Sequence, residues 1–252
     1  MNFENLKKGG KFAVLTAYDA PTARFLEEAG IPLILVGDSL ANCVLGYKDT
    51  KSISLEEMLH HTRAVARGAT NTLIIGDMPI NTYTNPSLAI INAKKFLGAG
   101  AHGVKIEGPK IEVVRALREK GIPVMGHIGL TPQTAEQYNV QGKTGEDAER
   151  LKDEARTLEK AGCFSLVLEC IPFSLGKEIT ELVGIPTIGI GAGPFCDGQV
   201  LVLSDVLGLT NGKKPKFAKQ YADFGNEIRK AAENFRNEVK DGKFPSEEHS
   251  YR

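Results

Sequence analysis

The most constraining feature of this sequence is a short apolar run, rich in Val and Ile, that recurs along the chain. Nearly continuous hydrophobicity over so few residues is typical of strands that are buried on both faces of a parallel sheet. The runs span residues 12–19, 33–39, 72–79, 103–108, 123–129, 165–170, 186–193 and 200–205. We therefore expect a largely parallel sheet rather than a helical bundle or a β-sandwich.

Stretches with helical character lie between several of these runs. They span residues 20–29, 55–66, 86–97, 109–120 and 146–161. Most are followed by a glycine, which supplies the left-handed residue of a helix C-cap, and Ser54 with Glu57 predicts a capping box. Strand followed by helix, repeated along the chain, predicts an α/β fold, a single-domain (β/α)8 TIM barrel. An open doubly wound sheet is the alternative.

The length of 252 residues agrees with one such barrel, which takes roughly 250 residues. We expect a single domain over 1–252, with 213–252 as a C-terminal extension that carries an additional helix. Apolar residues recur there at helical spacing: Phe217, Tyr221, Phe224, Ile228, Ala232, Phe235 and Val239. This stripe either closes the barrel or contacts another subunit.

Charge and composition exclude several classes of protein. The 31 basic and 31 acidic residues give a formal net charge of zero, which argues against a nucleic-acid binder. The polar start and the shortness of the longest apolar stretch, 31–36, predict neither export nor a membrane span, so we expect a cytoplasmic protein. No C-x-x-C pair suggests zinc or redox chemistry, and Pro194 breaks the dinucleotide-binding pattern in the run 189–193.

Polar residues stand where the predicted strands end, and barrel enzymes place their active sites at that edge. They are Tyr18, Asp19, Asp38, Ser39, Asp77, Lys105, Glu107, His127, Glu169 and Asp205. A single Asp at a strand end is usually a helix N-cap. The recurrence of carboxylates on one rim, however, favours a shared divalent cation, and oxygen ligands suit Mg²⁺.

Lys105 and Glu107 lie two positions apart on one strand, so both side chains face the barrel interior. Three interpretations of the lysine stay open: a cation for a substrate carboxylate, a Schiff-base nucleophile, or a structural ion pair with Glu107. Glu169 follows an apolar strand, where a raised pKa would suit a general base. His127 is either a proton carrier or a packed histidine at the barrel mouth.

Several long stretches resemble the ketopantoate hydroxymethyltransferase family, in the family's order and over nearly the whole chain. They are residues 15–24, 35–47, 57–69, 76–79, 98–108, 123–133, 166–172, 185–209, 215–221 and 244–251. The sequence departs from the family's usual pattern at 51–54 and at 136–139. The second departure bears on folate contact and loop closure rather than on the metal site.

The resemblance implies roles for individual residues. Asp38, Asp77 and Glu107 match the carboxylates of the family's metal site, one Mg²⁺ per subunit. Ser39 matches a residue that binds the substrate carboxylate, and Lys105 matches a substrate-binding lysine. Asp38 and Asp77 also match residues that contact the substrate. The match of Lys105 to a substrate-binding residue disfavours the Schiff-base interpretation.

Glu169 matches the family's catalytic base, and His127 matches a histidine near the substrate. The implied reaction transfers a hydroxymethyl group from 5,10-methylenetetrahydrofolate to 3-methyl-2-oxobutanoate, giving 2-dehydropantoate and tetrahydrofolate, the first step of pantothenate biosynthesis. The resemblance also implies a homo-oligomer, a decamer. Two rivals are an enzyme of the enolpyruvate mutase and isocitrate lyase group and a catalytically silent barrel that acts as a scaffold.

Overall fold

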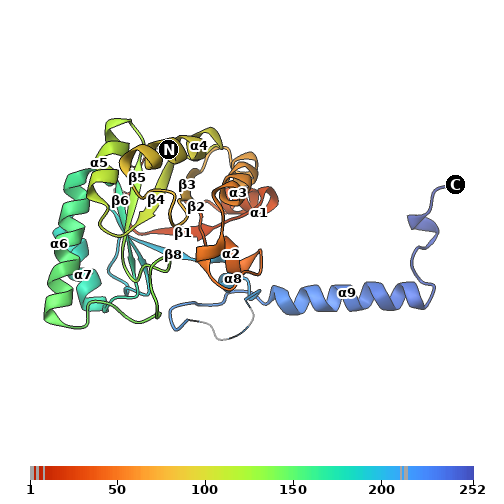
Figure 1. The fold of residues 1–252 in the computed structure, drawn as a ribbon. Coiled ribbons are helices and arrows are strands. Elements are labelled where there is room, and N and C mark those ends of the chain that lie inside the picture. Colours follow the sequence, from red (N-terminus) through yellow and green to blue (C-terminus); the bar gives the residue numbers. More distant parts are fainter. Residues whose placement is uncertain (1–2, 4–5, 8, 211, 213–214) are drawn as a thin grey trace. The chain divides into compact units, whose positions relative to one another are not determined.

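The computed structural model describes residues 3, 6–7, 9–210, 212 and 215–252, and the chain forms two units, Met1–Val202 and Leu203–Arg252. The first unit is a closed barrel of parallel strands (Figure 1). The strands are β1 (Phe12–Thr16), β2 (Leu33–Val36), β3 (Leu73–Asp77), β4 (Gly103–Glu107), β5 (Val124–Gly129), β6 (Ser165–Glu169), β7 (Thr187–Ile190) and β8 (Gly198–Leu201). Each strand pairs with its sequence neighbours, and β8 pairs with β1, which confirms the predicted barrel and excludes the open sheet.

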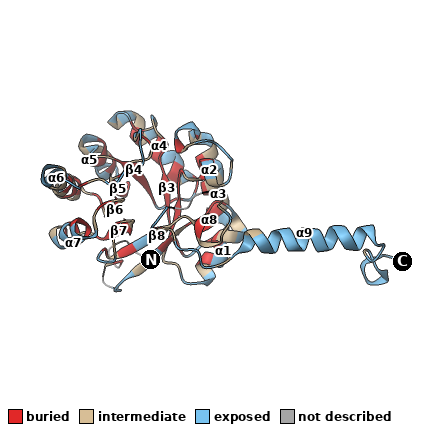
Figure 2. Cartoon of the chain, turned by 90° about the horizontal axis from the view of Figure 1, so that it is seen from below, coloured by how far each residue is buried: buried red, intermediate tan, exposed pale blue. Residues whose placement is uncertain are grey.

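Helices surround the barrel strands, and the strands are the buried part of the unit (Figure 2). The helices are α1 (Ala20–Glu28), α2 (Leu40–Cys43), η2 (Thr50–Ser52), α3 (Leu55–Gly68), α4 (Pro86–Gly98), α5 (Ile111–Glu119), α6 (Gly145–Ala161) and α7 (Phe173–Leu182). Local capping explains several boundaries. The predicted capping box of Ser54 and Glu57 is present at the start of α3, and Gly162, with φ 109°, ends α6 in the left-handed conformation.

Side chains that point into the barrel make up its core, as expected for alternate residues on strands. The cluster consists of Leu6, Val14, Leu33, Leu35, Leu73, Ile75, Met125, Val167, Ile188 and Val200. On β2 and β3 two of these inward residues lie at two-residue spacing, as the alternation requires. Two positions beyond the last core residue of β3, β5 and β6 lie Asp77, His127 and Glu169, polar residues of the candidate site.

The structure corrects the prediction of a helix after every strand. Residues 191–197 connect β7 to β8 without a helix, and Asp197 bonds through its side chain to the backbone N–H of Thr187 at 2.9 Å. β8 also begins earlier than predicted, at Gly198, and ends at Leu201. The prediction that Asp205 ends this strand is wrong, because Asp205 lies in the short helix α8 (Leu203–Val206) and accepts a hydrogen bond from Thr210 at 2.6 Å.

The second unit contains α8, the long helix α9 (Phe224–Lys240) and η3 (Glu247–His249). The additional C-terminal helix is therefore present, but Phe217 and Tyr221 precede it and do not belong to its apolar stripe. Phe235 of α9 packs edge-on against Phe244, at 5.3 Å between ring centroids. The single domain over 1–252 with an extension from 213 stays a prediction, and residues 213–214 lie outside the described part.

Among the residues that the structure describes, no helix has the length and apolar character needed to cross a membrane. No disulfide joins the four cysteines, all of which lie in the described part of the chain.

Candidate functional site

The alternation of inward side chains carries the predicted site residues into the barrel. On β3, Leu73 and Ile75 belong to the apolar core, and Asp77 is the next inward residue. On β6, Val167 belongs to the core and Glu169 follows it in the same way. Polar residues thus form the layer above the apolar layers, at the C-terminal ends of the strands, where barrel enzymes carry their chemistry.

Lys105 on β4 lies between two carboxylates. It is in register with Asp77 on the neighbouring strand, and its Nζ lies 2.5 Å from Asp77 Oδ2 and 3.9 Å from Glu107 Oε1. Its principal partner is therefore Asp77. Glu107, the partner in the structural ion-pair interpretation, is farther away. Burial disfavours the charged ammonium, but Asp77 and Glu107 outweigh this effect and raise the pKa of Lys105. The lysine is a cation at neutral pH.

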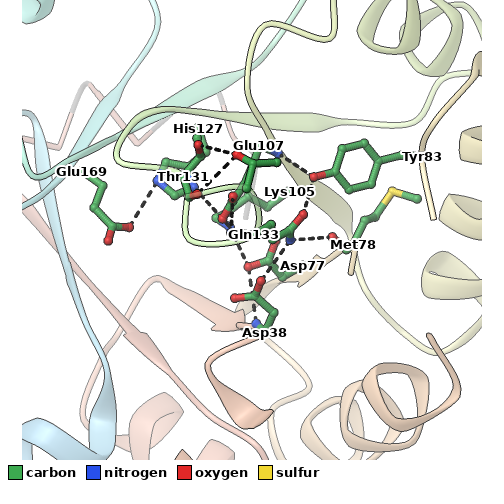
Figure 3. Close-up of polar contacts among 11 residues, drawn as sticks. Asp38, Asp77, Met78, Tyr83, Lys105, Glu107, His127, Thr131, Gln133 and Glu169 are labelled. Atoms are coloured by element: carbon green, nitrogen blue, oxygen red, sulfur yellow. Dashed lines mark hydrogen bonds and ion pairs between the residues drawn. The ribbon is translucent and has the colours of Figure 1, made fainter. Parts of the chain in front are cut away.

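His127 on β5 links two further carboxylates. Its Nδ1 lies 3.4 Å from Glu107 Oε1, and its Nε2 lies 3.2 Å from Glu169 Oε2 (Figure 3). Burial and the charge of Lys105 oppose protonation of the ring, yet the contacts with Glu107 and Glu169 prevail and raise its pKa to about 9. His127 is therefore an imidazolium that joins the interior cluster to Glu169, whose side chain is 15% exposed at the rim.

Glu169 is positioned by the backbone around it. The carbonyl of Glu169 accepts a hydrogen bond from Leu130 N–H at 2.9 Å, and a side chain at Gly129, with φ 93°, would collide with that carbonyl. Cys170, directly after Glu169, has a φ of 48° and bonds through its N–H to Ile190 O. The strand end is thus held on both sides at the residue that carries the carboxylate.

Asp38 follows β2 and is 7% exposed. Its N–H donates to Asp77 Oδ2 at 3.4 Å, so the two carboxylates are neighbours. Burial, and then the charge of Asp77, raise the pKa of Asp38 to about 8, and burial likewise raises that of Asp77. Glu107 behaves differently, because its contacts with His127 and Lys105 overcome burial and lower its pKa. Asp38 and Asp77 are thus adjacent buried carboxyl groups that hold their protons more tightly than exposed ones do.

A magnesium ion suits this donor set. Oδ1 of Asp77 is buried without a hydrogen-bond partner, and such a group is costly unless something binds it. Within the described residues, no three His, Cys, Asp or Glu side chains already form a metal-binding group. Mg²⁺ is usually held by one or two carboxylates together with water and substrate, rather than by a closed protein cage. Asp38 and Asp77 can supply such carboxylates, with Glu107 nearby.

Ser39 lies next to this cluster because it directly follows Asp38 in the sequence. It precedes α2, and its hydroxyl lies 2.8 Å from the phenol oxygen of Tyr18, a buried side chain after β1. Asp19, by contrast, caps α1 by accepting from Thr22 N–H at 2.8 Å. The structure therefore separates the two polar residues that follow β1: Tyr18 faces the site through Ser39, and Asp19 has a structural role.

Sequence reasoning missed two residues of the cluster, Gln133 and Tyr83. Gln133 is 1% exposed and contacts Asp38 and Glu107, and the hydroxyl of Tyr83 contacts Gln133 (Figure 3). Gln133 ends one of the stretches that carry the family resemblance, but an uncharged side chain in a loop gives no sign of burial. Tyr83 lies in the polar stretch 81–85, and nothing in that stretch predicts that its side chain belongs to the site.

Solved structures with the same fold include a 2,3-dimethylmalate lyase of the PEP mutase/isocitrate lyase superfamily, with a TM-score of 0.64 and 16% identity over 95% of this chain and 86% of that one. A phosphonopyruvate hydrolase in complex with oxalate and Mg²⁺ has a TM-score of 0.66 and 13% identity, over 98% and 91% of the two chains. Identities this low show the fold alone.

Sequence relatives are much closer. The 3-methyl-2-oxobutanoate hydroxymethyltransferase of Thermotoga sp. (strain RQ2) is 54% identical over 100% of this chain and 96% of its own length. The protein of the same name from Heliobacterium modesticaldum is 51% identical over 98% and 92%. The family model described as ketopantoate hydroxymethyltransferase matches residues 2–247. The rim of carboxylates, the central lysine and the linked glutamate thus stand in a chain that belongs to the ketopantoate hydroxymethyltransferase family.

Proposed function

We propose that this enzyme transfers a hydroxymethyl group from 5,10-methylenetetrahydrofolate to 3-methyl-2-oxobutanoate, giving 2-dehydropantoate and tetrahydrofolate, the first step of pantothenate biosynthesis. Relatives named 3-methyl-2-oxobutanoate hydroxymethyltransferase align over 98–100% of this chain. The observation that carries the proposal is the unbroken line of charged groups from Asp38 and Asp77 through Lys105 to His127 and Glu169. It offers cationic and carboxylate groups for a 2-oxo acid at one end and a carboxylate base at the other.

Asp38 and Asp77 would hold Mg²⁺, with Glu107 as the third carboxylate of the metal site. The bound ion supplies Lewis-acid stabilisation of the negative charge that develops on the 2-oxo oxygen when C3 is deprotonated. The support in this chain is the buried, unpartnered Oδ1 of Asp77 and the proximity of Asp77 to Asp38, whose pKa burial and the charge of Asp77 raise.

Lys105 and Ser39 bind the substrate carboxylate in this proposal. The ammonium of Lys105 is protonated because Asp77 lies 2.5 Å away, and a protonated amine cannot attack a carbonyl to form a Schiff base. Its role is therefore that of a fixed cation. The hydroxyl of Ser39 has Tyr18 as its partner and can donate its own hydrogen to a substrate oxygen while it accepts from Tyr18.

Glu169 is the general base that removes the proton from C3. Its carboxylate lies at the rim, and its Oε2 is held 3.2 Å from Nε2 of His127. His127 thereby orients the base and ties it to Glu107. The resulting C3 nucleophile forms a bond to the methylene carbon carried by folate. Both bonds from that carbon to the two folate nitrogens break, water supplies the hydroxyl group, and the C3 proton and the remaining water proton end on the two nitrogens of tetrahydrofolate.

The proposal includes a homo-oligomer, a decamer, in the cytoplasm. α9 has no buried residue, although Phe224, Ile228, Phe235 and Val239 give it an apolar stripe with exposures of 48–59%. Such a stripe is expected to meet a second copy of the chain. Four cysteines without a disulfide are typical of a reducing compartment. Light scattering of Ile228→Glu should give a smaller particle than the unmodified protein; an unchanged mass would remove α9 from the interface.

The decisive experiment follows exchange of the C3 proton of 3-methyl-2-oxobutanoate in D₂O by NMR, with and without EDTA and without folate. We expect exchange that requires both protein and Mg²⁺. Glu169→Gln should slow it by roughly 10²- to 10⁴-fold, whereas Glu181→Gln, on the surface of α7, should not. Exchange that is insensitive to EDTA would favour a Lys105 Schiff base, which borohydride would trap. Failure to form 2-dehydropantoate with both substrates present would contradict the proposed reaction.

A further inference from the structure

Gln133 occupies a place in which its side chain must find partners inside the protein. It lies in a turn after β5, in which Thr134 and Ala135 bond through their N–H groups to Thr131 O at 3.1 and 2.9 Å. The turn directs Gln133 into the barrel, where it is 1% exposed. A primary amide has two donor hydrogens and one acceptor oxygen, and burying it without partners is costly.

The partners of the amide determine its orientation. Nε2 lies 2.9 Å from Asp38 Oδ2 and 3.0 Å from Met78 O; the carbonyl oxygen can only accept hydrogen bonds, and so can the carboxylate when it is ionised. The NH₂ group must therefore face them, and the amide oxygen faces Tyr83. The hydroxyl of Tyr83 donates to Gln133 Oε1 at 2.5 Å. A flipped amide would set its oxygen against a carboxylate and a carbonyl.

The same network reaches Glu107 by two routes. The backbone N–H of Gln133 donates to Glu107 Oε2 at 3.0 Å. The phenol oxygen of Tyr83, whose hydrogen is already engaged, accepts from the N–H of Glu107 at 3.3 Å. One residue thus connects Asp38, after β2, with Glu107, on β4, and passes over the end of β3 at Met78 (Figure 3).

We propose that Gln133 is a positioning residue for the metal-site carboxylates: its side chain fixes Asp38, its backbone fixes Glu107, and Tyr83 locks the amide in the orientation that does so. Gln133 engages Oδ2 of Asp38 and Oε2 of Glu107 and leaves the other oxygen of each carboxylate to other partners. Two like charges would otherwise rotate apart, so the network sets their arrangement before a cation arrives. The inference rests on the proposed function in one respect, the assignment of these carboxylates to a metal.

The test measures the affinity for Mn²⁺ directly, by the electron paramagnetic resonance signal of the free ion, with and without saturating 3-methyl-2-oxobutanoate. Gln133→Met keeps the length of the side chain and removes its hydrogen bonds. We expect a loss of about 10- to 100-fold in Mn²⁺ affinity, the range found when groups that orient metal ligands are removed. Tyr83→Phe, which deletes one hydroxyl and leaves the amide in place, should cause a smaller loss in the same direction and serves if Gln133→Met does not fold.

Matched controls make the same chemical changes elsewhere. Gln199→Met removes a hydrogen bond to Gly193 O, and Tyr47→Phe removes one to Glu57; neither should change the Mn²⁺ affinity. Turnover offers a second readout. In Gln133→Met, the Mn²⁺ concentration that gives half-maximal C3 exchange should rise.

The outcomes separate this inference from the proposed function. Unchanged Mn²⁺ affinity in folded Gln133→Met and Tyr83→Phe would overturn the positioning role while leaving the reaction intact. Absence of Mn²⁺ binding by the unmodified protein, with or without the keto acid, would also overturn it, and the product assay would still judge the reaction independently. A fall in stability without a change in affinity would identify Gln133 as a packing residue.

Discussion

Replacing Lys105 by methionine should reveal how strongly the buried charges of the site depend on one another. The variant keeps the apolar stem and removes an ammonium that is 2.5 Å from Asp77 Oδ2 and 3.9 Å from Glu107 Oε1. With an effective dielectric constant of about 20, Coulomb's law gives attractions of about 7 and about 4 kcal/mol at these distances. A desolvation cost of several kcal/mol per buried ion offsets much of this attraction. We expect a net loss of about 3 to 5 kcal/mol in the free energy of unfolding, because the carboxylates stay buried without their cation.

The loss should depend on pH. Without Lys105, the pKa of Asp77 rises further above its value in the unfolded chain, so the folded variant binds more protons than the unfolded one at pH values above about 4. Stability falls with rising pH wherever the folded state binds the extra proton. The variant should therefore lose more stability at pH 8 than at pH 5.5, where protonation relieves the unpaired carboxylates.

Urea unfolding followed by circular dichroism in EDTA, at both pH values, measures these differences. Lys177→Met makes the same change at an exposed pair with Glu181, at 3.8 Å, and should leave the unfolding midpoint nearly unchanged. A cost for Lys105→Met below about 1 kcal/mol, or an equal cost at the two pH values, would refute the argument that the cation balances buried carboxylates.

Three further predictions concern the metal site, the histidine and one helix terminus. Asp38→Ala should lose the rise in melting temperature that Mg²⁺ and 3-methyl-2-oxobutanoate together give the unmodified protein; a full Mg²⁺-dependent rise in the variant would exclude Asp38 as a ligand. The folded pKa of His127, about 9, exceeds the unfolded value of about 6.5. Its contribution to stability is therefore complete below pH 6.5 and is lost as pH rises through 9. The difference in unfolding free energy between the unmodified protein and His127→Gln in EDTA should accordingly shrink by about 2 to 3 kcal/mol across that window, and a constant difference would show that the ring is neutral in the fold. Ser54→Ala removes both hydroxyl contacts of the capping box and should cost about 1 kcal/mol in urea unfolding; no cost would mean that Glu57 caps the helix alone.

The fold was predictable because its signals are local. Apolar runs long enough for one buried strand, separated by helices with their own caps, leave few arrangements open. The capping box at Ser54 and the glycine at 162 are present as expected, since both depend on residues within one helical turn. The connection from β7 to β8 was not predictable in this way. Residues 191–197 have no helical sequence pattern, and a helix was expected there only because a (β/α)8 barrel usually has one after each strand.

The two departures from the family's usual pattern lie in segments that are distant in the sequence and close together in the structure. The segments 51–54 and 136–139 are far apart in sequence, yet Lys51 Nζ donates to Ala135 O at 3.0 Å, directly beside the second segment. Two unusual loops thus meet in space, and their changes can compensate one another. No sequence signal connects them, because the contact depends on where the barrel places its loops.

What the sequence by itself determined is the set of chemically capable groups and the face on which each one lies. Alternation along a strand places Asp77 and Glu169 on the face of their inward apolar neighbours, and Lys105 on the same face as Glu107, and this needs no knowledge of other strands. The tertiary structure alone decided which of these groups are partners. Residues two apart on one strand are separated by about 6.6 Å along it, whereas neighbouring strands are about 4.8 Å apart, so Lys105 pairs with Asp77 across the sheet more closely than with Glu107 on its own strand. The burial of Gln133 depends on the same closure of the barrel, which brings its loop over the ends of three strands.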